Sequence, residues 1–340
     1  MAAQQVKPKI SQPQAVELVK RLFRLTPSEI RSLPSYDDQN FFVAVAGEGE
    51  YVLKITNSKD SKNSNMVEVQ TYAMTFLHQH GLPVQSVIPT ISGQLMSLEE
   101  MDCGYGSQKY LVRLLTYLPG ITISKAPLTP QLMYEAGKTA ARMDQILQKM
   151  VHPHLNALQR ENFLWSLSST PLLERYVHVL DEEPLQEIVK SVIRINHGDL
   201  NDLNVLVQPD GSDGYRISGI IDFGDMYSGY YVHELAMVIT CMMIEHPYPI
   251  EAGGPVLAGW ESVLPLNEAE KDCLYVLLLC RFCQLLVLVR HFLTLYPDNV
   301  EYLMIIPKKV IHILPQMWEL GKEHVEKVWF QSAAQFRGQD

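Results

Sequence analysis

The chain has 340 residues and a formal net charge of −10, and 47% of its residues are hydrophobic. This apolar content supports one large domain or two lobes and excludes a disordered chain. The acidic balance argues against a nucleic-acid-binding protein, which normally presents a basic face. An N-terminus without an apolar segment makes a secretory signal unexpected. We therefore expect a cytoplasmic protein that binds neither nucleic acid nor membranes.

The most apolar stretch, residues 274–289, is interrupted by Arg281 and Gln284. We expect it to form a buried helix rather than a span across a bilayer. The chain has five cysteines, and Cys280 and Cys283 lie on the apolar pattern of that helix without a second pair nearby. Buried, reduced thiols are therefore expected rather than a zinc site, and reduced thiols fit the cytoplasm.

The first third of the chain has the pattern of a small antiparallel sheet with two helices. Gly47-Glu48-Gly49 separates two alternating segments and predicts a hairpin turn. Gly81 and Pro83 end the helix that follows this hairpin. The expected elements are helices at 12–24 and 66–79 and strands at 41–46, 50–56, 86–90, 94–99 and 109–115.

Leu118-Pro119-Gly120 is a natural boundary, and we expect Thr116 and Tyr117 to form a hinge before it that contacts the nucleotide. The expected lobes are residues 1–117, which bind the nucleotide, and 118–340, which bind the substrate. The second lobe is mostly helical, with helices expected at 130–149, 171–180, 185–194, 231–245, 268–295 and 305–329. The sequence thus predicts an α+β protein with a small antiparallel-sheet lobe and a larger helical lobe.

Two short motifs carry the residues that phosphoryl transfer needs. The first is His197-Gly198-Asp199 with Asn204 at the end of the same loop, and the second is Asp222-Phe223-Gly224. The segments 205–208 and 215–221 flank a run of turn formers, so they predict a β-hairpin between the motifs. Phosphoryl transfer requires metal ions that neutralise phosphate charge and a base that orients the nucleophile. We expect Asp199 to be this base, and Asn204 and Asp222 to hold Mg²⁺.

These motifs, with Asp225 after the second, resemble those of the aminoglycoside phosphotransferase and choline kinase family of small-molecule kinases. Three longer segments, 34–41, 110–120 and 196–202, resemble the subgroup that phosphorylates 5-hydroxy-L-lysine with GTP as donor. The resemblance runs from about residue 12 to residue 333 and implies a bilobal, protein-kinase-like fold. The segment before His197 is shorter than in that subgroup, which bears on the stability and activity of the larger lobe.

On the nucleotide side, Lys54 lies at the centre of an apolar strand, where a buried ammonium needs an anionic partner. We expect Lys54 to bind phosphate and Glu68, on the following helix, to be its ion-pair partner. The alternatives are a lysine that reaches water from an edge strand and a glutamate that complements its helix dipole. Ser35 and Asn40 stand where a glycine-rich loop is common, so they either donate to phosphates or form a polar turn.

On the substrate side, the chain enters a helix soon after Asp225, which leaves no segment for docking a polypeptide. A small acceptor follows, and Asp225, Glu234 and the acidic pair Asp37-Asp38 are candidates for its cationic groups. We expect the two aspartates of that pair to face solvent or the acceptor. Arg281 meets either the acceptor carboxylate or a buried acid such as Glu234.

Three readings of the function remain open from the sequence. The first is a kinase that transfers phosphate from GTP or ATP to 5-hydroxy-L-lysine. The second keeps the fold and changes the acceptor to choline, homoserine or an aminoglycoside. The third is a non-catalytic, pseudokinase-like binding protein, against which the presence of Lys54, Asp199, Asn204 and Asp222 argues.

Overall fold

The computed structural model describes residues 6–336 apart from 105, 161–162, 164–166, 182, 184, 187–202, 212–213, 227–230 and 296–306. Asp199 and most of the helix expected at 185–194 therefore lie outside the described residues. The chain divides into two compact units. We call the first the sheet unit; it comprises Met1–Pro119, Met150–Leu158 and Gly219–Gly224. The second, the helical unit, comprises Gly120–Lys149, Gln159–Ser218 and Asp225–Asp340.

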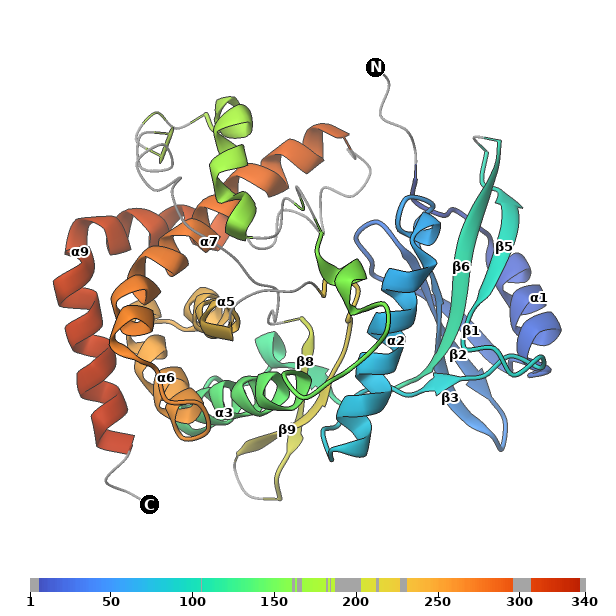
Figure 1. The fold of residues 1–340 in the computed structure, drawn as a ribbon, viewed down its shortest axis with the longest axis horizontal. Helices are drawn as coiled ribbons and strands as arrows, with labels where there is room; N and C mark the ends of the chain where they lie inside the picture. The colour runs from blue at the N-terminus through green and yellow to red at the C-terminus, as the bar shows by residue number, and fades with distance from the viewer. Residues whose placement is uncertain are drawn as a thin grey trace. The chain divides into compact units, whose positions relative to one another are not determined.

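The sheet unit is built on an antiparallel sheet with strand order β1-β2-β3-β6-β4, and β5 also pairs with β6. Two helices accompany the sheet, and Figure 1 shows them on opposite faces of it. The elements are α1 (Gln12–Phe23), β1 (Glu29–Leu33), β2 (Gln39–Val45), β3 (Gly49–Ile55), α2 (Ser64–Gln79), β4 (Val87–Ile88), β5 (Ser97–Asp102) and β6 (Ser107–Thr116). Short 3₁₀ turns occupy Asp60–Lys62 and Leu155–Leu158.

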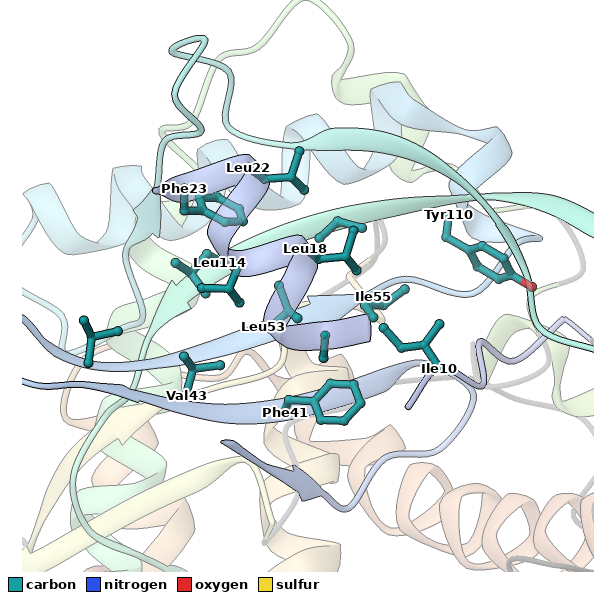
Figure 2. Packing of buried hydrophobic residues seen from close by; sticks show 14 of the residues in the cluster. Ile10, Leu18, Leu22, Phe23, Phe41, Val43, Leu53, Ile55, Tyr110 and Leu114 are labelled. Atoms are coloured by element: carbon teal, nitrogen blue, oxygen red, sulfur yellow. The ribbon is translucent and has the colours of Figure 1, made fainter. Parts of the chain in front are cut away.

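One face of this sheet is apolar and packs against α1. Alternate residues of three strands, among them Phe41, Leu53 and Leu114, join Leu18 and Leu22 of α1 in one buried cluster (Figure 2). Because successive side chains of a strand point to opposite faces, the residues between them face the other side, toward α2. The sheet therefore separates an apolar layer from a face that carries polar residues.

The helical unit consists of helices packed around the strongly apolar α5 (Tyr231–Glu245). In Figure 1, α9 lies on the outside of this group, next to α7 and α6. The remaining elements are β7 (Ile121–Thr122), a 3₁₀ turn at Ile123–Lys125, α3 (Pro130–Leu147), the 3₁₀ segment η4 (Leu167–Val179), β8 (Val205–Pro209), β9 (Tyr215–Ile220), a 3₁₀ turn at Pro249–Ala252, α6 (Gly253–Glu261), α7 (Glu268–Leu295) and α9 (Pro307–Phe336). The predicted hairpin is present as β8 and β9, which form a three-stranded sheet with β7.

The helix α7 has the length and hydropathy of a membrane span between Glu268 and Thr294, but 83% of its most apolar window is buried inside the protein. It is the core helix that the sequence predicts. Cys280 and Cys283 are buried within it and form no disulfide, also as expected. The two units together confirm the α+β class, with an antiparallel sheet in one and mostly helices in the other.

Candidate active site

Lys54 lies at the centre of the polar face of the sheet. Its strand neighbours Leu53 and Ile55 are fully buried on the α1 side, so the lysine projects to the opposite side. The residue is only 7% exposed, and its Nζ lies 2.9 Å from Oδ2 of Asp38 and 3.2 Å from Oδ1 of Asp222. Burial alone would lower the pKa of Lys54, but the two carboxylates outweigh it and raise that pKa above its usual value. Lys54 is therefore a charged, preoriented ammonium.

Asp222 is held by a loop that is tied to the sheet unit at both ends. Before it, the backbone N–H of Ile220 donates to the carbonyl of Pro83. After it, the side-chain amide of Gln70 on α2 donates to the carbonyl of Gly224. Asp222 itself has a φ of 58°, in the left-handed region that a residue with a side chain rarely adopts. Such strain persists only where the surroundings impose it, and it is common at functional sites.

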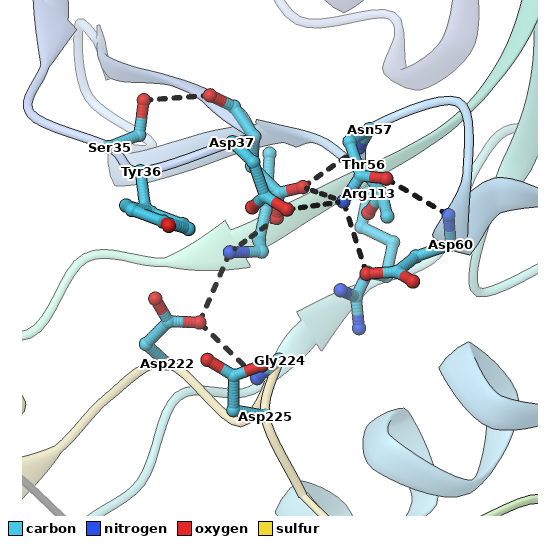
Figure 3. Close-up of polar contacts among 12 residues, drawn as sticks. Ser35, Tyr36, Asp37, Thr56, Asn57, Asp60, Arg113, Asp222, Gly224 and Asp225 are labelled. Atoms are coloured by element: carbon cyan, nitrogen blue, oxygen red, sulfur yellow. Dashed lines mark hydrogen bonds and ion pairs between the residues drawn. The ribbon is translucent and has the colours of Figure 1, made fainter. Parts of the chain in front are cut away.

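The electrostatics of Asp222 follow from this placement. Its Oδ1 accepts hydrogen bonds from Lys54 and from the backbone N–H of Gly224 (Figure 3). The nearby Lys54 ammonium holds the pKa of Asp222 below its usual value. The carboxylate is thus ionised at neutral pH. Its side chain is 47% exposed, so it remains accessible to a ligand.

Arg113 and Asn40 complete the polar face on either side of Lys54. In the strand register, Lys54 pairs with Asn40 on β2 and with Arg113 on β6. The guanidinium of Arg113 donates to the hydroxyl of Thr71 on α2 at 3.1 Å. Within the described part of the chain, Nε of Arg113 and Oδ1 of Asn40 are buried without a hydrogen-bond partner. Polar atoms of this kind are unusual in a folded protein and mark a place where a bound group is expected.

The expected pairing of Lys54 with Glu68 is not the one the structure has. Lys54 contacts Asp38 and Asp222, whereas the carboxylate of Glu68 lies 3.5 Å from Nε2 of His152. Of the two surroundings expected for Asp38, solvent or the acceptor, solvent is wrong, because Asp38 is only 9% exposed. The physical reason is that Asp38 directly precedes β2, the strand next to that of Lys54, so its carboxylate reaches the lysine from within the same sheet.

The other residues expected on the nucleotide side are fixed by local hydrogen bonds. The hydroxyl of Ser35 donates to the carbonyl of Asp38, which closes the loop before β2. Thr116 bonds to the segment before β4 through its backbone and its hydroxyl, which accepts from the N–H of Ser86. Tyr117 donates its N–H to the carbonyl of Glu50, and its ring meets Phe42 edge-on at 4.9 Å. These contacts give residues 116–117 a defined conformation, and their role as a hinge stays a prediction.

The residues expected on the substrate side belong to the helical unit and divide into two groups. Asp225 lies 3.3 Å from Nη1 of Arg160, and that guanidinium stacks over the ring of Phe163 at 3.6 Å. Arg281 is 3% exposed inside α7 and donates to the side chain of Gln284. It therefore lies in the core, and its pairing with a buried acid such as Glu234 stays a prediction.

Glu234 lies in the first turn of α5, where its charge complements the helix dipole. It lies close to Asp144 of α3, and burial together with the charge of Glu234 raises the pKa of Asp144 well above its usual value.

Asn204 directly precedes β8, where the sequence places it. It belongs to the helical unit, whereas Asp222 belongs to the sheet unit. The described residues contain no group of three or more His, Cys, Asp or Glu side chains that would hold a metal ion.

Comparison with known proteins identifies relatives along the whole chain. The model of the phosphotransferase enzyme family matches residues 29–271. A hydroxylysine kinase from Danio rerio is 56% identical and covers 99% of both chains. A hydroxylysine kinase from Bos taurus is 46% identical over 97% of this chain and 95% of its own. The alignment with the Danio rerio protein extends over 353 positions, so that protein has residues that this chain lacks.

Solved structures agree on the fold. An amicoumacin kinase superposes with a TM-score of 0.66 at 16% identity, covering 94% of each chain. A microcompartment-associated aminopropanol kinase superposes with a TM-score of 0.61 at 16% identity, covering 90% of this chain and 98% of its own. The protein-kinase-like fold is thereby confirmed, and the sequence relatives make the protein a kinase with an alcohol group as acceptor. The chain belongs to the phosphotransferase enzyme family and, within it, to the hydroxylysine kinases.

Proposed function

We propose that this protein transfers the γ-phosphoryl group of GTP or ATP to the hydroxyl group of 5-hydroxy-L-lysine. The acceptor oxygen forms the new bond to phosphorus, the bond from phosphorus to the β–γ bridging oxygen breaks, and the nucleoside diphosphate leaves. The observation that carries the proposal is the identity of 56% and 46%, over almost the full length, with proteins named hydroxylysine kinase. We also propose that the reaction takes place in the cytoplasm, which fits five cysteines that form no disulfide.

In this proposal the sheet unit binds the nucleotide. Lys54 contacts the phosphates, since it is charged, buried and held in one direction by two carboxylates. Ser35 and Asn40 lie on the loop and strand beside it, and Asn40 is its direct cross-strand neighbour. Thr116 and Tyr117 form the hinge that meets the base. The buried Nε of Arg113, a donor without a partner in the described part of the chain, supports a bound anion at this face.

We assign Mg²⁺ to Asn204 and Asp222. Carboxylate and amide oxygens are hard ligands, and Mg²⁺ is usually held by one or two carboxylates together with substrate phosphates. Asp222 fits this role because it is ionised and half exposed in a strained loop. When bound, the ion neutralises charge on the transferred phosphoryl group. Asp199 then accepts the proton of the acceptor hydroxyl as it attacks.

For the acceptor, the ion pair of Asp225 and Arg160 supplies opposite charges next to each other. An α-amino acid is itself a pair of opposite charges, so its ammonium matches Asp225 and its carboxylate matches Arg160. Arg281 is too deeply buried for this task, and Glu234 is a second candidate for an acceptor amine. Choline lacks the carboxylate and so offers no group that matches Arg160.

The test is an acceptor panel with the purified full-length protein, Mg²⁺ and γ-labelled GTP or ATP. We expect label transfer to 5-hydroxy-L-lysine, with kcat/KM at least about 100-fold above that for homoserine or choline, because a site that pairs a charged group rejects analogues lacking it. Homoserine is included because homoserine kinases, such as that of Granulibacter bethesdensis at 24% identity, are also related. A higher kcat/KM for either alternative would refute the assignment of the acceptor.

A further inference from the structure

The two carboxylates on Lys54 differ in how firmly they are held. The side chain of Asp222 is 47% exposed, and it follows the strand β9 on a loop. The side chain of Asp38 is 12% exposed and approaches from the segment just before β2. The contact of Lys54 with Asp38 is also the shorter of the two, at 2.9 Å against 3.2 Å. Asp38 is thus the more permanent neighbour of the ammonium.

Asp38 is oriented by Asn57, and its two oxygens have separate tasks. Oδ1 accepts from the backbone N–H of Asn57 at 2.8 Å and from its side-chain amide at 3.2 Å. Oδ2 is the atom that meets Lys54. A carboxylate that accepts hydrogen bonds on one oxygen cannot rotate freely, so the other oxygen has a fixed direction. This arrangement aims a negative charge at Lys54 before any nucleotide arrives.

Asn57 is itself fixed by the turn that follows β3. Its Oδ1 accepts from the backbone N–H groups of Lys59 at 3.1 Å and Asp60 at 2.9 Å. Its side-chain amide also contacts carboxylate oxygens of Asp60 and Asp37 (Figure 3). Asn57 is only three residues after Lys54, so the end of β3, the turn after it and the carboxylate of Asp38 are joined by local contacts. The hydrogen bonds that hold Asn57 and Asp38 come from residues outside α2, the helix that carries Glu68.

The charges on this face show why a fixed carboxylate is needed. Lys54 and Arg113 are direct cross-strand neighbours, and like charges in that position repel each other. Asp222 and Asp38 balance the two cations and favour the charged form of both. In the proposed reaction Asp222 is shared with Mg²⁺, so part of its charge is withdrawn from Lys54. Asp38 is then the carboxylate that remains.

We propose that Asp38, oriented by Asn57, is the positioning residue for Lys54 during nucleotide binding, in the role that the sequence assigns to Glu68. This inference rests on the proposed function, in which Lys54 contacts the phosphates. It predicts that loss of the Asp38 carboxylate weakens nucleotide binding through Lys54, and only through Lys54. Removing Glu68 affects the contact with His152 and leaves the direction of Lys54 unchanged.

The experiment is a double-mutant cycle on nucleotide affinity in the full-length protein. The variants are Asp38→Asn, Lys54→Met and the double variant, and the readout is the Kd for Mg²⁺–GTP and Mg²⁺–ATP by calorimetry. We expect Asp38→Asn to raise Kd about 10-fold or more, since breaking a buried charge pair is costly. In the Lys54→Met background the same change should alter Kd less than about 2-fold, because coupled residues are not additive. Glu99→Gln, which removes a carboxylate of β5 that pairs with Arg21 of α1, is the matched control.

An equal rise of Kd in both backgrounds would mean that Asp38 acts on the fold rather than on Lys54, and would overturn the inference. So would a Glu68→Gln variant that weakens binding as much as Asp38→Asn. If Lys54→Met leaves nucleotide affinity and turnover unchanged, the proposed function of Lys54 fails instead. Should Asp38→Asn not fold, Asn57→Ser tests the same arrangement, because it leaves the carboxylate and the backbone N–H and removes the side-chain amide that also orients Asp38. We expect Kd to rise in that variant, and an unchanged Kd would also overturn the inference.

Discussion

Nζ of Lys54 on β3 lies 3.2 Å from Oδ1 of Asp222, although the two residues are far apart in the sequence. The contact joins the central strand of the sheet to the Asp-Phe-Gly loop. Each residue shifts the pKa of the other toward its charged form. The proposed phosphate ligand and one of the proposed metal ligands are thus already adjacent and ionised in the absence of nucleotide.

The first prediction follows from this pair. Asp222→Ala should abolish the dependence of nucleotide affinity on Mg²⁺, because the variant lacks a carboxylate that the proposed metal site needs. The measurement is a titration of GTP and ATP with and without Mg²⁺, for the wild type and the variant. Phosphoryl transfer by the wild type in excess EDTA would contradict the metal assignment.

The second prediction concerns Asp199, which lies outside the described residues. Asp199→Asn should leave nucleotide affinity within about 2-fold and lower kcat about 10²- to 10⁴-fold, the usual contribution of a general base. This corresponds to about 3–5 kcal/mol of transition-state stabilisation. Single-turnover kinetics separate the chemical step from binding. A variant with the kcat of the wild type would remove Asp199 from the mechanism.

The third prediction is a loss of stability in mild acid, caused by His233 on α5. Burial lowers the pKa of His233 from 6.5 to about 4. Above pH 6.5 the histidine is neutral in both states, and its contribution to stability is fully present. Between pH 6.5 and about 4 only the unfolded chain binds the proton, so the free energy of unfolding falls as the pH falls. The loss from this residue is at most about 3 kcal/mol.

Urea unfolding at pH 7.5, 6.0 and 5.0 measures this effect. His233→Gln cannot take up the proton, so its stability should depend less on pH than that of the wild type. His78→Gln, at an exposed histidine of α2, is the control and should keep the wild-type dependence. Identical pH profiles for the wild type and His233→Gln would show that another group causes the acid sensitivity.

The sequence predicts most of the fold because its signals are local. The hairpin of β2 and β3 follows from alternation around Gly47-Glu48-Gly49, and α7 follows from a long apolar segment. Among the elements that were not predicted are β1 and α6. β1 is a largely exposed edge strand with a polar sequence, and α6 begins with Gly253-Gly254-Pro255, which resembles a turn. These glycines are needed because a Cβ on Gly253 would lie 2.4 Å from the ring of Trp329, a contact that sequence patterns do not reveal.

The residues of the candidate site also fall into those that the sequence identifies and those that only the structure reveals. Lys54 was identified because a single lysine within an apolar strand needs a partner, and Asp222 because of its motif. The partner Asp38 was missed because its direction depends on hydrogen bonds from Asn57. Asn57 lies in the turn after β3, and no sequence pattern indicates that this turn meets Asp38. Arg113 was missed because its meaning depends on strand register, and Arg160 because it precedes the motif of Asp225 by a long stretch of chain. Contacts between distant segments are therefore the part that required a structure.

The last prediction concerns recognition of the acceptor carboxylate by Arg160. We compare 5-hydroxy-L-lysine with its methyl ester, which keeps both amines and the hydroxyl and lacks the negative charge. For the wild type, the ester should have a KM at least about 10-fold higher, because it offers no carboxylate to Arg160 and a site that pairs a charged group rejects analogues lacking it. Lysine, which has no hydroxyl, should bind weakly as a competitive inhibitor without turnover.

Arg160→Gln should raise the KM of the amino acid to that of the ester and make the two acceptors equivalent. Arg175→Gln, at an exposed arginine of the helical unit, should keep the difference. If Arg160→Gln still prefers the amino acid over the ester, the carboxylate is recognised elsewhere and Arg160 serves only to hold Asp225.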